Sequence, residues 1–179
     1  MFNAVIEEVL VKADRTALRS LSQPARCILL LLRSLSSRMR LTEVQALLEG
    51  QGYKCRSIEK IAKLLEKMGL LECNPAGCAL TEAGEELRDA VHDVVENTRS
   101  FAYKVIEGGF DESDVLAELV TSTASTVGLV EAYLEEPRLF RLYYVLHLYV
   151  TGFTSIVLAE LSRRDPRVYE AVLSFLSGG

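Results

Sequence analysis

Apolar residues recur every three or four positions along most of the chain, which is the spacing of an amphipathic helix. The first such segment starts at Phe2 and continues to about Ala13. Residues 28–32 are apolar on all sides, so the second helix is expected to lie at the centre of the protein. With the helix caps and breakers added, the pattern predicts helices that begin near residues 2, 24, 42, 56, 82, 111, 138 and 166.

One short interruption of the helical pattern predicts a β-hairpin. Residues 70–73 and 78–80 have the length and composition of strands, and the four residues NPAG between them favour a turn. Thr81 then stands where it can cap the next helix, which is expected to continue to about Ile106. The predicted fold class is therefore mainly α with a small β-hairpin.

Residues 56–72, RSIEKIAKLLEKMGLLE, divide most clearly into two faces. At about 100° per residue, apolar side chains collect on one side of the predicted helix and cations on another. Gly69 is expected to end the helix. The apolar side consists of Ile58, Ile61, Ala62, Leu65 and Met68, and the basic side of Arg56, Lys60, Lys63 and Lys67.

Two local patterns around this stretch resemble a known group of proteins. Residues 21–29 (LSQPARCIL) resemble the LxxPxRxxIL opening of ArsR-like winged-helix regulators. Residues 65–71 (LEKMGLL) and 80–87 (LTEAGEEL) resemble the LxxxGLh and LTxxGxxL signature shared by ArsR-, MarR- and PadR-like proteins. The resemblance implies a winged helix-turn-helix domain over residues 21–98. An N-terminal helix over residues 1–20 would precede it, and a helical C-terminal region over residues 99–179 would dimerise the chain or receive a signal.

What the resemblance implies for function is sequence-specific binding of double-stranded DNA by a homodimeric transcriptional regulator of archaeal or thermophile type. The start of the basic helix would enter the major groove, where Arg56, Ser57 and Lys60 reach bases and the remaining cations contact phosphates. The expected DNA-binding residues are Lys54, Arg56, Ser57, Lys60, Lys63 and Lys67.

A competing interpretation is a winged-helix module that binds another protein in a larger assembly, without reading DNA. The basic face would then be a solvated surface with charge pairs such as Glu59 with Lys63. The turn of the hairpin carries no Lys or Arg and offers phosphate little beyond backbone N–H groups and Asn74, which also favours this alternative. If DNA is bound, the neutral turn adds little affinity, so tight binding depends more on a dimer with two recognition helices.

Charge is unevenly distributed along the chain. The net charge is −5, so any nucleic-acid binding must depend on a local patch. Residues 24–72 hold nine Lys/Arg against five Asp/Glu, whereas residues 99–179 hold seven against eleven. The first ten residues contain two glutamates and do not resemble a signal peptide, which predicts a cytoplasmic protein. The low content of Asn and Gln, three of each, suggests a thermophilic source.

Four cysteines are present, and no CxxC pair suggests zinc. Cys73 and Cys78 flank the predicted turn, where they form either a cross-strand disulfide, structural or redox-sensing, or a pair of small hairpin residues. Cys27 and Cys55 are expected to be buried apolar residues.

An acidic group on the helix after the hairpin is the only candidate for a metal site. Asp89, His92, Asp93 and Glu96 share one side of that helix, and ArsR-like metal sensors use such residues at a dimer interface. A solvated acidic face is the favoured interpretation. No cofactor is predicted.

The uncharged residues 142–159 reach the lower length limit for a membrane span. His147 and several hydroxyl groups dilute their apolarity, so a buried central helix or a dimer interface is favoured over a membrane helix. Phe140, Tyr143, Tyr144 and Tyr149 are expected to belong to the core, with the lining of a ligand pocket as the less favoured alternative, and no small-molecule effector is identified. The sequence has no P-loop, GxGxxG, GxSxG or HExxH motif, so an enzyme is the least favoured class.

Overall fold

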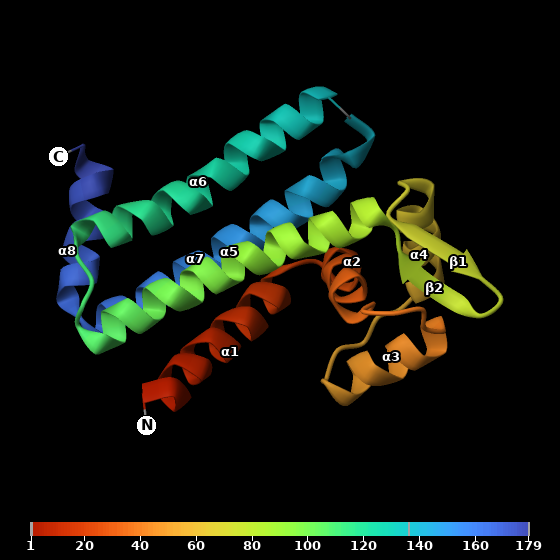
Figure 1. Cartoon of the computed structure of the whole chain (residues 1–179), viewed down its shortest axis with the longest axis horizontal. Helices are drawn as coiled ribbons and strands as arrows, with labels where there is room; N and C mark the ends of the chain where they lie inside the picture. The colour runs from red at the N-terminus through yellow and green to blue at the C-terminus, as the bar shows by residue number, and fades with distance from the viewer. Residues whose placement is uncertain (1, 136, 179) are drawn as a thin grey trace.

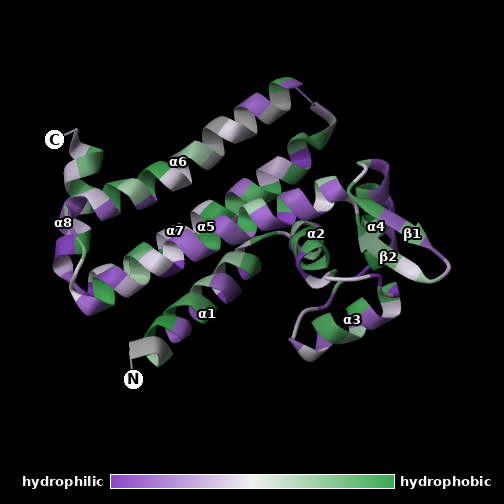
Figure 2. Ribbon diagram, in the orientation of Figure 1, coloured by the Kyte–Doolittle hydropathy of each residue, from purple (hydrophilic) through white to green (hydrophobic). Residues whose placement is uncertain are grey.

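The computed structural model describes residues 2–135 and 137–178 of the chain (Figure 1). It is mainly helical with one antiparallel hairpin, as the sequence predicted. Figure 2 shows hydrophobic and hydrophilic residues on the same helices, as expected of amphipathic segments. The elements are α1 (Phe2–Ser20), α2 (Gln23–Ser34), α3 (Leu41–Gly50), α4 (Ile58–Lys67), β1 (Leu71–Asn74), β2 (Gly77–Leu80), α5 (Glu82–Glu107), α6 (Glu112–Glu135), a 3-10 turn η1 (Pro137–Leu139), α7 (Phe140–Arg164) and α8 (Pro166–Ser177).

Helices α2, α3 and α4 with the hairpin β1–β2 form a small unit, here called the hairpin unit. Helix α2 is its centre and buries six consecutive residues, residues 27–32, because it lies between the other helices of the unit and α7. Met39, between α2 and α3, pairs with Cys78 of β2 through two backbone hydrogen bonds of 2.8 and 2.9 Å. This bridge fixes the start of α3 against the hairpin.

The remaining helices, α1 and α5–α8, form a helical bundle with α7 at its centre (Figure 1). Helix α7 packs against α1, α5, α6 and α8, and ten of its side chains are buried. Among the described helices it alone is long and apolar enough to cross a membrane, and half of its most apolar stretch is buried within the protein. Tyr149 lies in the core as expected, whereas Phe140 and Tyr144 do not: they stack on each other and are exposed.

The connection from the hairpin to α5 explains the LTEAGEEL motif. The Thr81 hydroxyl donates to the Gly69 carbonyl at 2.6 Å and accepts from the Gly84 N–H at 3.2 Å, so it caps α5 and holds the end of α4. A Cβ on Gly84 would lie 2.2 Å from the carbonyl oxygen of Leu70. The glycine is therefore required because α5 and the start of the hairpin are in direct backbone contact.

Several predicted boundaries are wrong. Helix α1 continues to Ser20, seven residues beyond the end at about Ala13 that the apolar pattern predicts and level with the end of the N-terminal segment 1–20, because its apolar side also buries Ala17 and Leu18 against the bundle. Helix α3 starts after Arg40, whose N–H is capped by the Glu43 carboxylate at 2.9 Å, and not at Thr42. The segment predicted to begin α7 at residue 138 is a 3-10 turn. The helix predicted from Glu82 to about Ile106 is observed as α5, which ends at Glu107 and runs through residues 98 and 99.

All four cysteines are joined in disulfides. Cys73 and Cys78 are opposite each other in the hairpin, and their sulfur atoms are bonded across it. Cys27 and Cys55 are buried, as expected, but they also form a disulfide that the sequence reasoning missed. They are distant in the sequence, but the loop before α4 crosses α2 and brings their Cα atoms to 5.5 Å. The two bonds lie just before and just after α4.

Candidate nucleic-acid interface

Helix α4 has one buried and one exposed face. Its apolar side chains pack toward α2 and β1, and Ile58, Ile61, Ala62 and Leu65 are all buried. Lys60, Lys63 and Lys67 are exposed. The spacing of three and four residues puts these lysines on a common side of the helix, away from the core of the hairpin unit.

The other predicted contact residues lie before α4 and not within it. Lys54, Arg56 and Ser57 are exposed in the loop that leads to the helix. Ser57 adopts φ +64°, in the left-handed region, and its carbonyl accepts hydrogen bonds from the N–H groups of Lys60 and Ile61. The predicted start of the helix at Arg56 is therefore wrong by two residues, because the backbone turns at Ser57 before the helix begins.

The cations of this surface are not neutralised by neighbouring carboxylates. None of Lys54, Arg56, Lys60, Lys63 and Lys67 forms an ion pair with any residue that the structure describes. The i,i+4 pair of Glu59 with Lys63, which would make the face an ordinary solvated surface, is not formed. The Glu66 carboxylate instead accepts from the backbone N–H of Cys73 at 3.3 Å.

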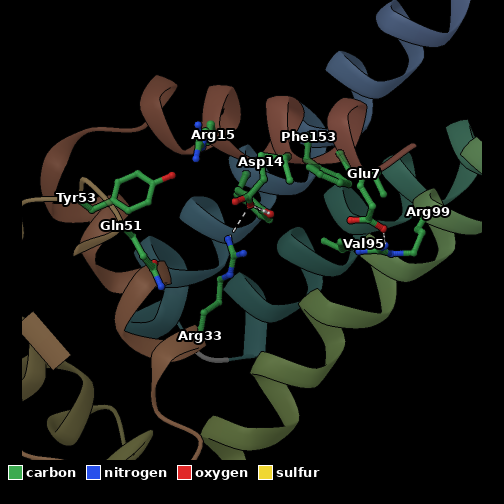
Figure 3. Close-up of a pocket in the computed structure, with 12 residues that line it drawn as sticks. Glu7, Asp14, Arg15, Arg33, Gln51, Tyr53, Val95, Arg99 and Phe153 are labelled. Atoms are coloured by element: carbon green, nitrogen blue, oxygen red, sulfur yellow. Dashed lines mark hydrogen bonds and ion pairs between the residues drawn. The ribbon is translucent and has the colours of Figure 1, made fainter. Parts of the chain in front are cut away.

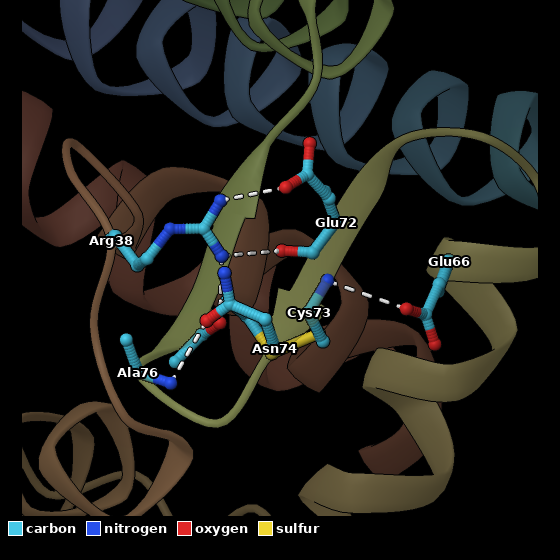
Figure 4. A network of polar contacts seen from close by, with 8 residues as sticks. Arg38, Glu66, Glu72, Cys73, Asn74 and Ala76 are labelled. Carbon is cyan, nitrogen blue, oxygen red and sulfur yellow. Dashed lines mark hydrogen bonds and ion pairs between the residues drawn. A yellow bond between two sulfur atoms is a disulfide. The ribbon is translucent and has the colours of Figure 1, made fainter.

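Figure 4 shows how the hairpin is held beside α4. Arg38 forms an ion pair with the Glu72 carboxylate at 2.9 Å and donates to the Gly77 carbonyl at 2.9 Å, so it spans both strands. The Asn74 side chain accepts from the Ala76 N–H at 2.9 Å and closes the turn. Since the strands extend through Asn74 and Gly77, only two residues form the turn itself, and neither is charged.

A groove of about 430 Å³ separates α4 from the hairpin and the start of α3. Two cations, Arg40 and Lys63, and two carboxylates, Glu59 and Glu66, line the groove, so its charges balance. The groove adds shape to this face but no surplus of positive charge. The basic character of the face comes from the cations of α4 and of the loop before it.

The acidic candidates on α5 are not assembled into a site. Asp89, His92 and Asp93 are exposed, and Asp89 is paired with Arg88 at 2.9 Å. Glu96 is paired with Arg99 at 3.2 Å. Within the described ranges, no group of three or more His, Cys, Asp or Glu side chains lies close enough to hold a metal ion.

Two polar clusters that join different helices were missed by the sequence reasoning. In the first, Asp14 of α1 accepts from Arg33 of α2 at 2.8 Å (Figure 3) and from the Tyr149 hydroxyl of α7 at 2.6 Å. Burial opposes the charge of Arg33, but Tyr149 and Asp14 outweigh this effect and raise the pKa of Arg33. Burial also raises the pKa of Tyr149. The one available signal was the position of Asp14, which lies three or four residues from Leu10, Ala17 and Leu18 on the apolar side of α1.

The second cluster joins α5 to α6. The buried Thr98 hydroxyl donates a hydrogen bond to the buried Glu118 carboxylate. Burial raises the pKa of Glu118, and the hydrogen bond from Thr98 only partly opposes this shift. Each residue looks like an ordinary surface residue in the sequence, because only the packing of the two helices removes them from water.

No family model matches this chain, and comparisons with curated proteins and with solved structures also find no match.

Proposed function

We propose that this protein binds double-stranded DNA sequence-specifically as a homodimeric transcriptional regulator, and that α4 is its recognition helix. The observation that carries the proposal is the row of exposed cations on α4, none of which is paired with a described residue, on a helix whose opposite face is buried. The order of α2, the Met39 bridge, α3, α4, the hairpin and α5 supports a winged helix-turn-helix, as do the motifs at residues 21–29 and 80–87.

The position of each cation suggests its role. Arg56 and Ser57 precede the first turn of α4 and Lys60 lies within it, so this end of the helix would enter the major groove and reach base edges. Lys63 and Lys67 lie farther along the helix and would contact phosphates, as would Lys54 in the loop. Each phosphate neutralised releases a counterion, so binding would weaken as salt rises.

Dimerisation follows from the weakness of the hairpin as a DNA contact. Its two-residue turn, Pro75 and Ala76, is neutral, so one protomer would bind DNA mainly through α4. Two copies would present two α4 helices to successive major grooves, about 34 Å apart. The affinity of the dimer would then exceed that of a single α4.

A second candidate is a docking module that binds another protein through the same face. The exposed Glu59, the neutral hairpin turn and Leu64, which is 40% exposed on α4, favour it, since phosphate repels a carboxylate and gains nothing from an apolar side chain. The overall charge of −5 points the same way.

Binding to generic duplex DNA at low salt distinguishes the two candidates. A DNA-binding protein is expected to show micromolar or tighter affinity in about 50 mM salt and to lose most of it by about 200 mM. No detectable binding in about 50 mM salt would contradict the proposed function and favour the docking module. If binding is found, selection from a random duplex library would reveal the preferred sequence.

A further inference from the structure

We propose that a groove between α6, α7 and α8 binds one molecule of a single-chain amphiphile, in which an alkyl chain carries a sulfate or phosphate head group. The groove is here called the distal groove, because these three helices meet at the end of the bundle away from the hairpin unit (Figure 1). The proposal goes beyond the proposed function, because it concerns a different part of the chain and is measured without DNA.

The distal groove has a volume of about 620 Å³, which is within the range of small-molecule sites. Such sites are common between the helices of bundles. The groove is open because small side chains of α7, namely Ser155, Ala159 and Ser162, line it where α8 crosses α7. From Ser155 to Arg163 it follows α7 for about 12 Å, so it is long enough for an extended chain.

Apolar side chains at the edge of the distal groove are exposed in the folded protein. Leu176 is 70% exposed and Tyr169 is 55% exposed, and both line the groove together with Val172. The spacing of three and four residues puts all three on one side of α8. An alkyl chain in the groove would cover these side chains, and both hydrocarbon surfaces would leave water. The lining therefore favours a hydrocarbon chain over a polar ligand such as a sugar.

The end of the distal groove at the close of α7 is positively charged. Arg163 is its one charged lining residue among the described part of the chain. One oxygen of the Glu160 carboxylate accepts from both Lys12 and Arg163, each at 2.7 Å, so two cations share a single carboxylate. Arg164 is also exposed and forms no ion pair with a described residue. Three cations therefore stand against Glu160 at this end.

The other carboxylates of these helices are engaged elsewhere or do not pair with the three cations. Asp165 is held by Arg167 at 2.6 Å. Glu170 lines a separate cavity beside α8. Glu8, one turn before Lys12 on α1, forms no ion pair with any residue that the structure describes. The cationic end of the groove thus complements an anionic head group.

Arg163 has donors left for such a head group. It uses one N–H in its bond to Glu160, its side chain is 71% exposed, and its other N–H groups have no partner among the described residues. A sulfate or phosphate can accept two parallel hydrogen bonds from a guanidinium. The head group would then lie at Arg163 and the chain along Ala159 and Leu176.

Isothermal titration calorimetry of the whole protein with alkyl sulfates tests the proposal, at concentrations below those at which these compounds form micelles. Octyl sulfate and decyl sulfate differ by two methylene groups. Ethyl sulfate supplies the head group without the chain, 1-octanol supplies the chain without charge, and octyltrimethylammonium supplies the chain with the opposite charge.

Two variants separate the contributions of space and charge. Ala159→Trp fills the groove, and its matched control is Ala90→Trp, an exposed helical alanine of α5 that does not line the groove. Arg163→Gln removes the charge and leaves Glu160 paired with Lys12. Its matched control is Arg19→Gln, an exposed arginine of α1 that does not line the groove. Circular dichroism verifies that each variant is folded.

We expect one octyl sulfate to bind per chain with a dissociation constant of about 1 mM or lower, and decyl sulfate to bind about tenfold more tightly, because two further methylene groups leave water. Ethyl sulfate, 1-octanol and octyltrimethylammonium should each bind at least about fivefold more weakly than octyl sulfate. Ala159→Trp should weaken decyl sulfate binding by about tenfold or more and Arg163→Gln by about fivefold, while both controls bind as the wild type does.

The proposal is overturned if decyl sulfate does not bind at about 1 mM, or if Ala159→Trp binds it as tightly as Ala90→Trp does. Equal binding of 1-octanol and octyl sulfate would contradict the anionic head group. Sedimentation equilibrium tests the competing occupant, a second copy of the chain. If Ala159→Trp converts a wild-type dimer into a monomer and no alkyl sulfate binds, the distal groove is an interface between two copies and not a ligand site.

Discussion

The disulfide between Cys27 and Cys55 is predicted to contribute more to stability than the one in the hairpin. It closes a loop with a sequence separation of 28 residues, against 5 for Cys73 and Cys78. In the chain-entropy model, a cross-link restricts the unfolded chain more as the loop grows, which gives about 3.6 kcal/mol for the first bond and about 2 kcal/mol for the second. Cys27 and Cys55 also anchor the loop before α4 to α2.

Two double variants isolate these contributions. Cys73→Ala/Cys78→Ala retains only the long-loop bond, and Cys27→Ala/Cys55→Ala retains only the hairpin bond. Each is unfolded in urea with and without a phosphine reductant, after refolding in the same buffer, and followed by far-ultraviolet circular dichroism. Because each comparison uses one variant in two redox states, the cavity left by the alanines cancels. Thiol titration verifies that the bond is present or reduced.

The expected loss of unfolding free energy on reduction is about 3.6 kcal/mol in the first variant and about 2 kcal/mol in the second. Equal losses in the two variants would refute the argument from loop length. No loss in the first variant, with the bond shown to be present beforehand, would mean that the anchoring of the loop does not stabilise the fold.

Three further predictions concern stability. Gly84→Ala should destabilise the protein by about 1–3 kcal/mol, because the added Cβ would lie 2.2 Å from the Leu70 carbonyl oxygen. Gly128 lies in a helix with open space around it, so Gly128→Ala should instead stabilise the protein by about 0.5–1 kcal/mol. Urea unfolding measures both, and equal effects would contradict the account of the motif. Glu118→Gln should raise the melting temperature near pH 7. Burial raises the folded-state pKa of Glu118, so protonation of this carboxyl favours folding at low pH and the contribution is lost as pH rises. The increase in melting temperature caused by Glu118→Gln should therefore shrink toward about pH 4. An increase that does not depend on pH would contradict the raised pKa. Thr154→Val should stabilise the protein by about 1 kcal/mol, because the buried Thr154 hydroxyl has no hydrogen-bond partner among the residues that the structure describes. A loss of stability on urea unfolding would contradict this.

Elements whose pattern is local could be predicted from the sequence. The two faces of α4 follow from the helical period, because burial of Ile58, Ile61 and Leu65 leaves the lysines outside. Thr81 caps α5 and Gly69 follows the end of α4 with φ +75°, both as predicted from residue type. These positions are decided by residues within a few places along the chain.

Features that depend on distant segments could not be predicted. Cys27 meets Cys55 only because the loop before α4 folds across α2. The same loop turns at Ser57 in a conformation that residue type does not favour, so the start of α4 was placed too early. Asp14, Arg33 and Tyr149 come from three helices, and their proximity depends on how the bundle packs against the hairpin unit.

The salt dependence of duplex DNA binding by Lys60→Ala/Lys63→Ala tests the central claim most directly. The control is Arg19→Ala/Arg164→Ala, which removes two exposed charges outside α4 and so changes the net charge equally. If Lys60 and Lys63 both contact phosphate, the variant should bind much more weakly, and its slope of log affinity against log salt should fall by about 1.8 for each bound protomer. If Lys60 reads a base instead, the slope should fall by about half as much while sequence preference is lost. An affinity and slope equal to those of the control would contradict the assignment of this face to DNA.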